Sequence, residues 1–186
     1  MSVPASLSAI WDKVGAFFDR ALGAHPGAMR CAAGCADCCA PDLTVTELEA
    51  VAIAEFVNSL DESARARLLA NRSARLAATA GRRCPALGPD ERCGIYPVRP
   101  LVCRTHGLVI KLSSEAEDAQ PADERRHLPV LDACPKNFVG MDLTEVAPSA
   151  VLDQRTLSTL LYVANRAAGL RDQRVALAEL LVAEAD

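Results

Sequence analysis

The sequence has few aromatic residues, few lysines and no long hydrophobic run. Phe, Tyr and Trp together make up 4% of the 186 residues, and β-branched residues rarely occur in runs. This scarcity argues against a β-sandwich or barrel, whereas the 34 alanines favour closely packed helices. Because 51% of the residues are hydrophobic, a disordered chain is also excluded. The composition predicts a mainly α fold, and the length fits one domain over residues 1–186.

Positive charge is also scarce, since only three of the 20 basic residues are lysines and the net charge is −4. Sequence-independent binding of nucleic acid depends on excess positive charge, so we do not expect nucleic acid as a partner. No apolar run approaches the roughly 18 residues of a membrane span. No basic segment followed by an apolar one marks a secretion signal. We therefore expect a cytoplasmic protein without membrane contact.

Cysteine, by contrast, is abundant, with eight copies in the chain. They are Cys31, Cys35, Cys38, Cys39, Cys84, Cys93, Cys103 and Cys134. In a chain longer than about 100 residues and without a secretion signal, such a set indicates metal or redox chemistry rather than a disulfide framework. The first four lie within nine residues, which is too dense for thiols that only fill a core.

Hydrophobic periodicity predicts four or five helices. The expected ranges are 5–23, 44–60, 62–80, 149–168 and 171–184, so that 5–23, 44–80 and 149–184 are helical. Thr44 followed by Glu47 fits a capping box at the start of the second helix. On the fourth helix, Leu157, Leu160 and Leu161 share one face.

Proline and glycine concentrate in residues 82–112, which predicts turns, one or two short strands and a short helix near 98–105. The acidic segment 113–126 is expected to be a surface loop. The predicted fold is thus a small helical bundle. A cysteine-rich, turn-rich metal-binding region at 30–39 and 82–134, with one short β-hairpin, completes it.

The first four cysteines gather their thiols in either of two conformations. In a helix, at about 100° per residue, all four side chains point to one side. In a loop, Gly34 supplies the freedom to wrap a metal ion. Crowded thiolates repel one another unless they share a cation, so both conformations predict a metal. A disulfide between the adjacent Cys38 and Cys39 is a strained alternative.

The spacing discriminates among metal sites. Zinc fingers and ribbons need paired CxxC knuckles, and Cys35 and Cys38 form the single such pair. The spacing of Cys31, Cys35 and Cys38 matches the cluster loop of radical-SAM enzymes. The chain lacks their βα repeats, however, has Asp37 at a position where they favour an aromatic residue, and Cys39 is left unexplained. A thiol oxidoreductase that uses Cys35 and Cys38 is a further alternative.

Three motifs in order resemble the YkgJ-type cysteine-cluster family, over about residues 30–105. They are Cys31-x3-Cys35-x2-Cys38-Cys39, then Cys84-Pro85-Ala86-Leu87, then Cys93-Gly94-Ile95-Tyr96-Pro97-Val98-Arg99-Pro100-Leu101-Val102-Cys103-Arg104. That family is also described as a zinc- or iron-chelating domain, and its members are often labelled iron–sulfur proteins. A similar cluster occurs in the flagellin lysine methylase. The resemblance implies metal binding by the seven cysteines of these motifs, and we add Cys134 as an eighth candidate ligand.

Arginines stand beside several cysteines, and guanidinium groups near sulfur stabilise thiolates. We predict that Arg99 and Arg104 lie just outside the metal ligands, and that Tyr96 is half-buried. His106 follows Cys103 by three residues. It is either a ligand or an ordinary loop histidine.

The sequence therefore predicts a metal-binding protein that holds an iron–sulfur cluster, with [4Fe–4S] favoured. Its role would be electron transfer, redox sensing or accessory service to a protein partner, either a redox enzyme or a client. Zinc and mononuclear iron are the alternative cofactors. A structural zinc protein acting as an interaction or chaperone module is the second hypothesis, and a cluster-dependent enzyme the third. The number of sites stays open, because eight cysteines suffice for two four-thiolate sites or one shared cluster.

Overall fold

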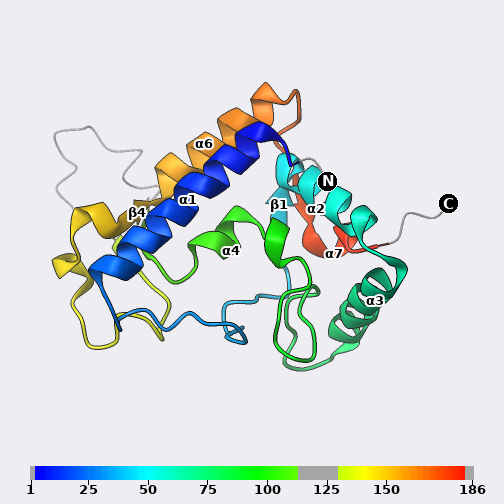
Figure 1. Cartoon of the computed structure of the whole chain (residues 1–186), viewed down its shortest axis with the longest axis horizontal. Coiled ribbons are helices and arrows are strands. Elements are labelled where there is room, and N and C mark those ends of the chain that lie inside the picture. The colour runs from blue at the N-terminus through cyan, green and yellow to red at the C-terminus, as the bar shows by residue number, and fades with distance from the viewer. Residues whose placement is uncertain (1–2, 113–129, 183–186) are drawn as a thin grey trace.

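Helices dominate the structure, a computed structural model that describes residues 3–112 and 130–182 (Figure 1). The α-helices are α1 (Ala5–Ala24), α2 (Glu47–Ser59), α3 (Glu62–Ala77), α4 (Leu101–Thr105), α6 (Gln154–Ala167) and α7 (Leu177–Leu180). The strands are β1 (Thr44–Thr46), β2 (Val109–Leu112), β3 (Val130–Asp132), β4 (Val151–Asp153) and β5 (Arg174–Ala176). Short 3-10 turns cover Tyr96–Val98, Leu143–Glu145 and Pro148–Ala150. In the described part of the chain, no helix has the length and apolar character needed to traverse a bilayer.

The helices α1 and α6 lie side by side along one edge of the molecule, and α4 lies against α1 on its other side (Figure 1). The apolar stripe predicted for residues 5–23 faces inward, with Leu7, Trp11 and Val14 buried. On α6, Leu161 is buried and Leu160 is exposed, so the face that these leucines share is only partly covered. The turn-rich segment contains the short helix predicted near residues 98–105, as α4.

The start of α2 differs from the prediction, because residues 44–46 form a strand. Strand β1 pairs with β5 in an antiparallel register that sets Val45 opposite Val175. Thr46 therefore caps α2 in place of Thr44: its Oγ1 accepts from the Glu49 backbone N–H (3.4 Å) and the Glu49 carboxylate accepts from the Thr46 backbone N–H (3.0 Å). The two β-branched threonines and the valine between them favour the extended conformation that this pairing needs.

The C-terminal part is also less helical than predicted. Residues 151–153 form β4 and residues 174–176 form β5, so the expected helices 149–168 and 171–184 shrink to α6 and the four-residue α7. Asp153 caps α6 by accepting from the Thr156 backbone N–H (2.8 Å), which fixes where that helix begins. Local periodicity does not reveal these strands, because their partners lie far away in the sequence.

The strands form two small sheets rather than the one hairpin expected. The first contains β1 and β5. In the second, β2 lies between β3, which is antiparallel to it, and β4, which is parallel to it, so that Ile110 faces both Asp132 and Leu152. The expected surface loop at 113–126, between β2 and β3, lies outside the described residues.

Buried side chains form two hydrophobic clusters. The larger one unites α1, α2, α6 and α7 with the turn-rich segment, and contains Leu48, Ile53, Leu87, Ile95 and Val98. The smaller one, at the other end of α1, contains Ala21, Met29, Leu108, Val109, Phe138, Val146 and Ala150. The cysteine loop after α1 spans both, since Met29 belongs to the smaller cluster and Ala36 to the larger.

Candidate metal centre

Two successive turns shape the segment that carries the first four cysteines. The Cys35 backbone N–H donates to the Ala32 carbonyl (3.0 Å), and the Cys39 N–H donates to the Ala36 carbonyl (2.9 Å). Gly34 has a φ of +86°, a conformation that glycine adopts without strain. Of the two conformations considered, the segment adopts the loop.

One group of thiols, which we term the inner thiols, surrounds the end of this loop. It consists of Cys39, Cys84, Cys93 and Cys103. The Cys84 backbone N–H donates to the Cys39 carbonyl (3.1 Å), and Cys93 is joined to Leu87 by an antiparallel bridge. Burial, reinforced by the charges of Cys84 and Cys93, raises the pKa of Cys103 to about 12. These thiols are therefore close enough to oppose one another's ionisation.

Backbone amides lower the pKa of two of the inner thiols. Burial raises the pKa of Cys84 and Cys93, but the Ala86 N–H lowers the former and the Ile95 N–H lowers the latter. In both cases the donor lies two residues after the cysteine. Such N–H···S bonds stabilise thiolates and tune the metals that they bind.

The remaining cysteines, which we term the outer thiols, lie earlier in the loop or, in the case of Cys134, just after β3. They are Cys31, Cys35, Cys38 and Cys134. Burial raises the pKa of Cys31, a hydrogen bond from Asn137 lowers it, and the three other outer thiols raise it further. The pKa of Cys38 is raised, chiefly by its hydrogen bond to Cys39, and the pKa of Cys39 is lowered by the same bond. The outer and inner thiols thus meet at Cys38 and Cys39, which are adjacent in the sequence.

Asn137 is a residue that the sequence analysis missed. It is 4% exposed and makes three contacts: it accepts from the Arg30 N–H (2.7 Å), and its Nδ2 donates to the Gly107 carbonyl (2.7 Å) and lies 3.4 Å from the Cys31 sulfur. Nothing in the sequence marks it except its position three residues after Cys134. The tertiary structure shows that it ties three distant segments together at a cysteine.

Arg99 and Arg104 brace the turn between Cys93 and Cys103. Arg99 lies 3.9 Å above the Tyr96 ring and lowers the pKa of Cys93 by its charge, after burial and the Ile95 N–H. Arg104 lies 4.0 Å above Trp11 and donates to the carbonyl of Arg99 (2.9 Å). Burial, followed by Arg99, lowers the pKa of Arg104 to about 10. Their place just outside the ligands stays a prediction, whereas the half-buried position expected for Tyr96 was wrong because that side chain is exposed.

Arg75 of α3 and Arg83 hold the turn that follows Cys84. Arg75 donates to the carbonyl of Gly88 (2.8 Å) and, with Arg83, pairs with Glu91 at 3.3 and 3.2 Å. Arg83 also donates to the Ala36 carbonyl. The turn and the cysteine loop are therefore fixed to each other.

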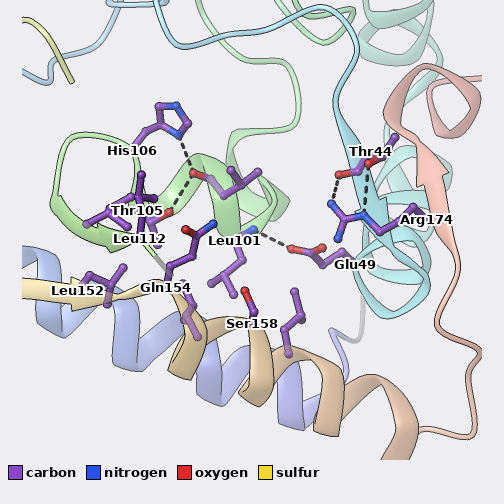
Figure 2. A pocket seen from close by; sticks show the side chains of 14 residues that line it. Thr44, Glu49, Leu101, Thr105, His106, Leu112, Leu152, Gln154, Ser158 and Arg174 are labelled. Atoms are coloured by element: carbon purple, nitrogen blue, oxygen red, sulfur yellow. Dashed lines mark hydrogen bonds between the residues drawn. The ribbon is translucent and has the colours of Figure 1, made fainter. Parts of the chain in front are cut away.

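The helix α4, which carries Cys103, is positioned from α2. The buried Glu49 carboxylate accepts from the Leu101 backbone N–H (2.7 Å), beside a cavity of about 240 Å³ (Figure 2). At the other end, His106 Nδ1 donates to the Val102 carbonyl (2.8 Å; Figure 2). In a neutral ring this bond leaves Nε2 as the acceptor, the tautomer that a metal-binding histidine uses. Whether His106 is a ligand stays open.

The eight free thiols are suitable ligands for a thiophilic metal, although they do not surround a common point in this structure. All eight cysteines are free, and thiolates are the preferred ligands of zinc and of iron–sulfur clusters. Among residues 3–112 and 130–182, no three Cys, His, Asp or Glu side chains stand close enough to hold a metal ion. Metal binding would therefore draw the loops together, as is common for metal sites coupled to folding.

Comparison with known families agrees with this donor set. The model of the CxxCxxCC family, described as "Putative zinc- or iron-chelating domain", matches residues 30–127, just over half of the chain. The chain belongs to this family. The resemblance inferred from the cysteine motifs is therefore confirmed, and membership in the CxxCxxCC family supports a role in binding zinc or iron. Neither the curated proteins nor the solved structures contain a match to the chain.

The family model covers all the cysteines except one. Seven of the eight cysteines lie inside residues 30–127, and Cys134 lies beyond them. Asn137 also lies outside the matched range. The family match therefore says nothing about Cys134 or Asn137, and only the structure places them near the other cysteines.

Proposed function

We propose that this member of the CxxCxxCC family holds an iron–sulfur cluster through its cysteines and serves in electron transfer, redox sensing or as an accessory to a partner enzyme. The observation that carries the proposal is a set of eight free thiols, most of them in irregular segments, with the Asn137 amide 3.4 Å from the Cys31 sulfur and backbone amides that lower the pKa of Cys84 and Cys93. Hydrogen bonds to sulfur and partial burial are the features with which proteins tune such clusters.

All eight cysteines are the proposed ligands, with a [4Fe–4S] cluster favoured. When bound, the cluster supplies reversible one-electron chemistry. Within the chain, the Ala86 and Ile95 amides stabilise the sulfurs of Cys84 and Cys93, and Arg99 adds positive charge nearby. A cytoplasmic location, where thiols stay reduced, and a protein partner that exchanges electrons or receives the cluster complete the proposal.

Metal analysis tests this proposal directly. We would purify the full chain without oxygen, measure iron, zinc and acid-labile sulfide, and record the visible spectrum before and after dithionite. Iron with matching sulfide and a bleachable visible band is the expected result. A protein that takes up neither iron nor zinc, even after reconstitution, would refute metal binding altogether.

Paired variants on α4 assign the metal to the thiols. Cys103→Ser replaces one half-buried thiol and should lower metal content and melting temperature, as should Cys38→Ser in the loop. Val102→Ala, an exposed neighbour of Cys103 on the same helix, is the matched control and should leave both unchanged. Full metal content and unchanged melting in both cysteine variants would refute this ligand assignment.

Structural zinc is the second candidate, favoured by the irregular backbone of the cysteine loop. Residues 29–43 contain turns but no helix or strand, and a zinc ion would stabilise such a segment by cross-linking it. In that case the purified protein is colourless, contains zinc without sulfide, and loses the order of its loops on chelation. The protein would then act as a scaffold or chaperone module for its partner.

A further inference from the structure

The two ends of the cysteine loop are anchored at different places in the fold. Met29, just before Cys31, is buried in the smaller hydrophobic cluster, whereas Ala36, just before Cys38 and Cys39, is buried in the larger one. The two ends of the loop therefore pack against different parts of the core. In Figure 1 the loop, drawn in blue, passes below α4.

The first end is held by the segment that contains Cys134. The Phe138 N–H donates to the Ala28 carbonyl (2.7 Å), and Phe138 packs in the same cluster as Met29. Lys136 Nζ lies 2.6 Å from an Asp37 carboxylate oxygen, on the residue before Cys38. Contacts on both sides of Cys31 and Cys35 therefore hold residues 134–138 against the outer thiols.

The second end is held by the segment of residues 83–93. The Cys84 N–H donates to the Cys39 carbonyl (3.1 Å), and Arg83 donates to the Ala36 carbonyl. Cys134, Cys35 and Cys38 oppose the ionisation of Cys31, whereas Cys84, Cys93 and, after them, Cys38 oppose that of Cys103, so Cys38 lies at the boundary between the two groups.

We propose that the cysteines form two separable metal centres, and that Cys134 completes the outer one with Cys31, Cys35 and Cys38. The inner centre then consists of Cys39, Cys84, Cys93 and Cys103. This inference rests on the proposed function, and it goes further by assigning a ligand that lies beyond the matched family domain. Four thiolates are a complete ligand set both for a [4Fe–4S] cluster and for a tetrahedral zinc ion.

Asn137 is the positioning residue of the outer centre. Its Nδ2 lies 3.4 Å from the Cys31 sulfur, and its other contacts, to the Arg30 N–H and the Gly107 carbonyl, fix the orientation of the amide. A β-carbon on Gly107 would lie 2.4 Å from the same sulfur. The sulfur of Cys31 thus lies against an N–H donor and against Gly107, where a β-carbon would not fit without a shift of that sulfur.

Metal counting in single-cysteine variants of the full chain tests this division. Iron and sulfide, or zinc, are measured per chain after anaerobic purification and reconstitution. Cys134→Ser should lose about half of the wild-type metal, and Cys93→Ser, its matched counterpart in the inner centre, should lose the other half. The double variant should lose nearly all of it. Each single variant should keep the visible spectrum of the centre that remains.

The outcomes separate this inference from the proposed function. A wild-type chain without iron or zinc refutes the proposed function. A wild-type chain with metal, and a Cys134→Ser variant with the same amount, refutes only the inference, as does complete loss of metal from either single variant, which indicates one shared centre. Circular dichroism of the metal-free variants, compared with metal-free wild type, shows whether a loss of metal reflects unfolding.

Asn137→Ala tests the positioning role while all eight cysteines are kept. Outer-sphere hydrogen bonds to metal ligands typically contribute about 10–100-fold in affinity. We expect a chelator to remove one half of the metal from Asn137→Ala at least about 10-fold faster than from wild type, and the other half at the wild-type rate. Equal rates for both halves would overturn this role of Asn137. Val139→Ala, which truncates an exposed side chain two residues away, is the control and should resemble wild type.

Discussion

Replacing Gly107 with alanine places a methyl group where the structure has no room for it. The added β-carbon would lie 2.4 Å from the Cys31 sulfur and 3.0 Å from Asn137 Nδ2. Gly107 also has a φ of +99°, which L-residues rarely adopt. Cys31 is able to rotate away from the new methyl group, but the rotation gives up the contact between its sulfur and Asn137.

The size of the effect follows from two costs. A non-glycine residue held in a disfavoured backbone conformation loses about 1–3 kcal/mol, and overpacking in a filled site costs about 1–3 kcal/mol. We therefore expect the free energy of unfolding to fall by at least about 2 kcal/mol. For a chain of this size, that loss corresponds to a melting temperature lower by roughly 4–8 °C.

Thermal melting of the metal-free protein measures this cost without any contribution from bound metal, and metal content is measured separately. Gly15→Ala is the matched control, because a β-carbon there meets nothing within 4 Å and the residue lies within α1. That substitution should raise the stability by about 0.5–1 kcal/mol. If Gly107→Ala melts at or above the wild-type temperature, the confinement of the Cys31 sulfur that we describe is refuted.

Three further predictions follow from the fold. Thr46→Ala removes the cap of α2 and should lower the free energy of unfolding by about 1 kcal/mol in urea titrations; an unchanged midpoint would exclude the capping role. Glu49→Gln places an amide where a buried carboxylate accepts from the N–H groups of Thr46 and Leu101, and should cost about 1–3 kcal/mol by the same assay. A variant as stable as wild type would show that Glu49 does not hold α4. Chelation of the metal should leave the far-ultraviolet circular dichroism largely helical, because the helices pack mainly through apolar side chains; collapse of that signal would contradict this independence.

The metal-binding family could be predicted from the sequence because its motifs are local. Four cysteines within nine residues, followed by two proline-flanked cysteine motifs, restrict the backbone and the chemistry wherever they occur. Helices α1 and α3 were predicted nearly to their ends for a similar reason, since apolar spacing over four turns or more outweighs distant contacts.

Three of the strands could not be predicted in this way, although β2 lies in the segment where short strands were expected. Residues 44–46, 151–153 and 174–176 lie beside or within apolar patterns that also suit a helix, and each becomes a strand because a distant segment supplies its backbone partner. The cap at Thr46 in place of Thr44 is a consequence, since the helix begins only where the pairing of β1 ends. Short strands of this kind depend on long-range contacts that a local pattern does not contain.

The same division applies to the candidate metal centre. The sequence by itself determined which atoms are available, namely eight thiols and the family to which their spacing belongs. Only the tertiary structure decided which thiols are neighbours, because the packing of Met29 and Ala36 in different clusters sends the two ends of one loop to different segments. It also brought Asn137 and Gly107, which no motif marks, against the sulfur of Cys31. Ligand chemistry is a property of residue types, whereas the grouping of ligands depends on hydrophobic packing between residues far apart in the chain.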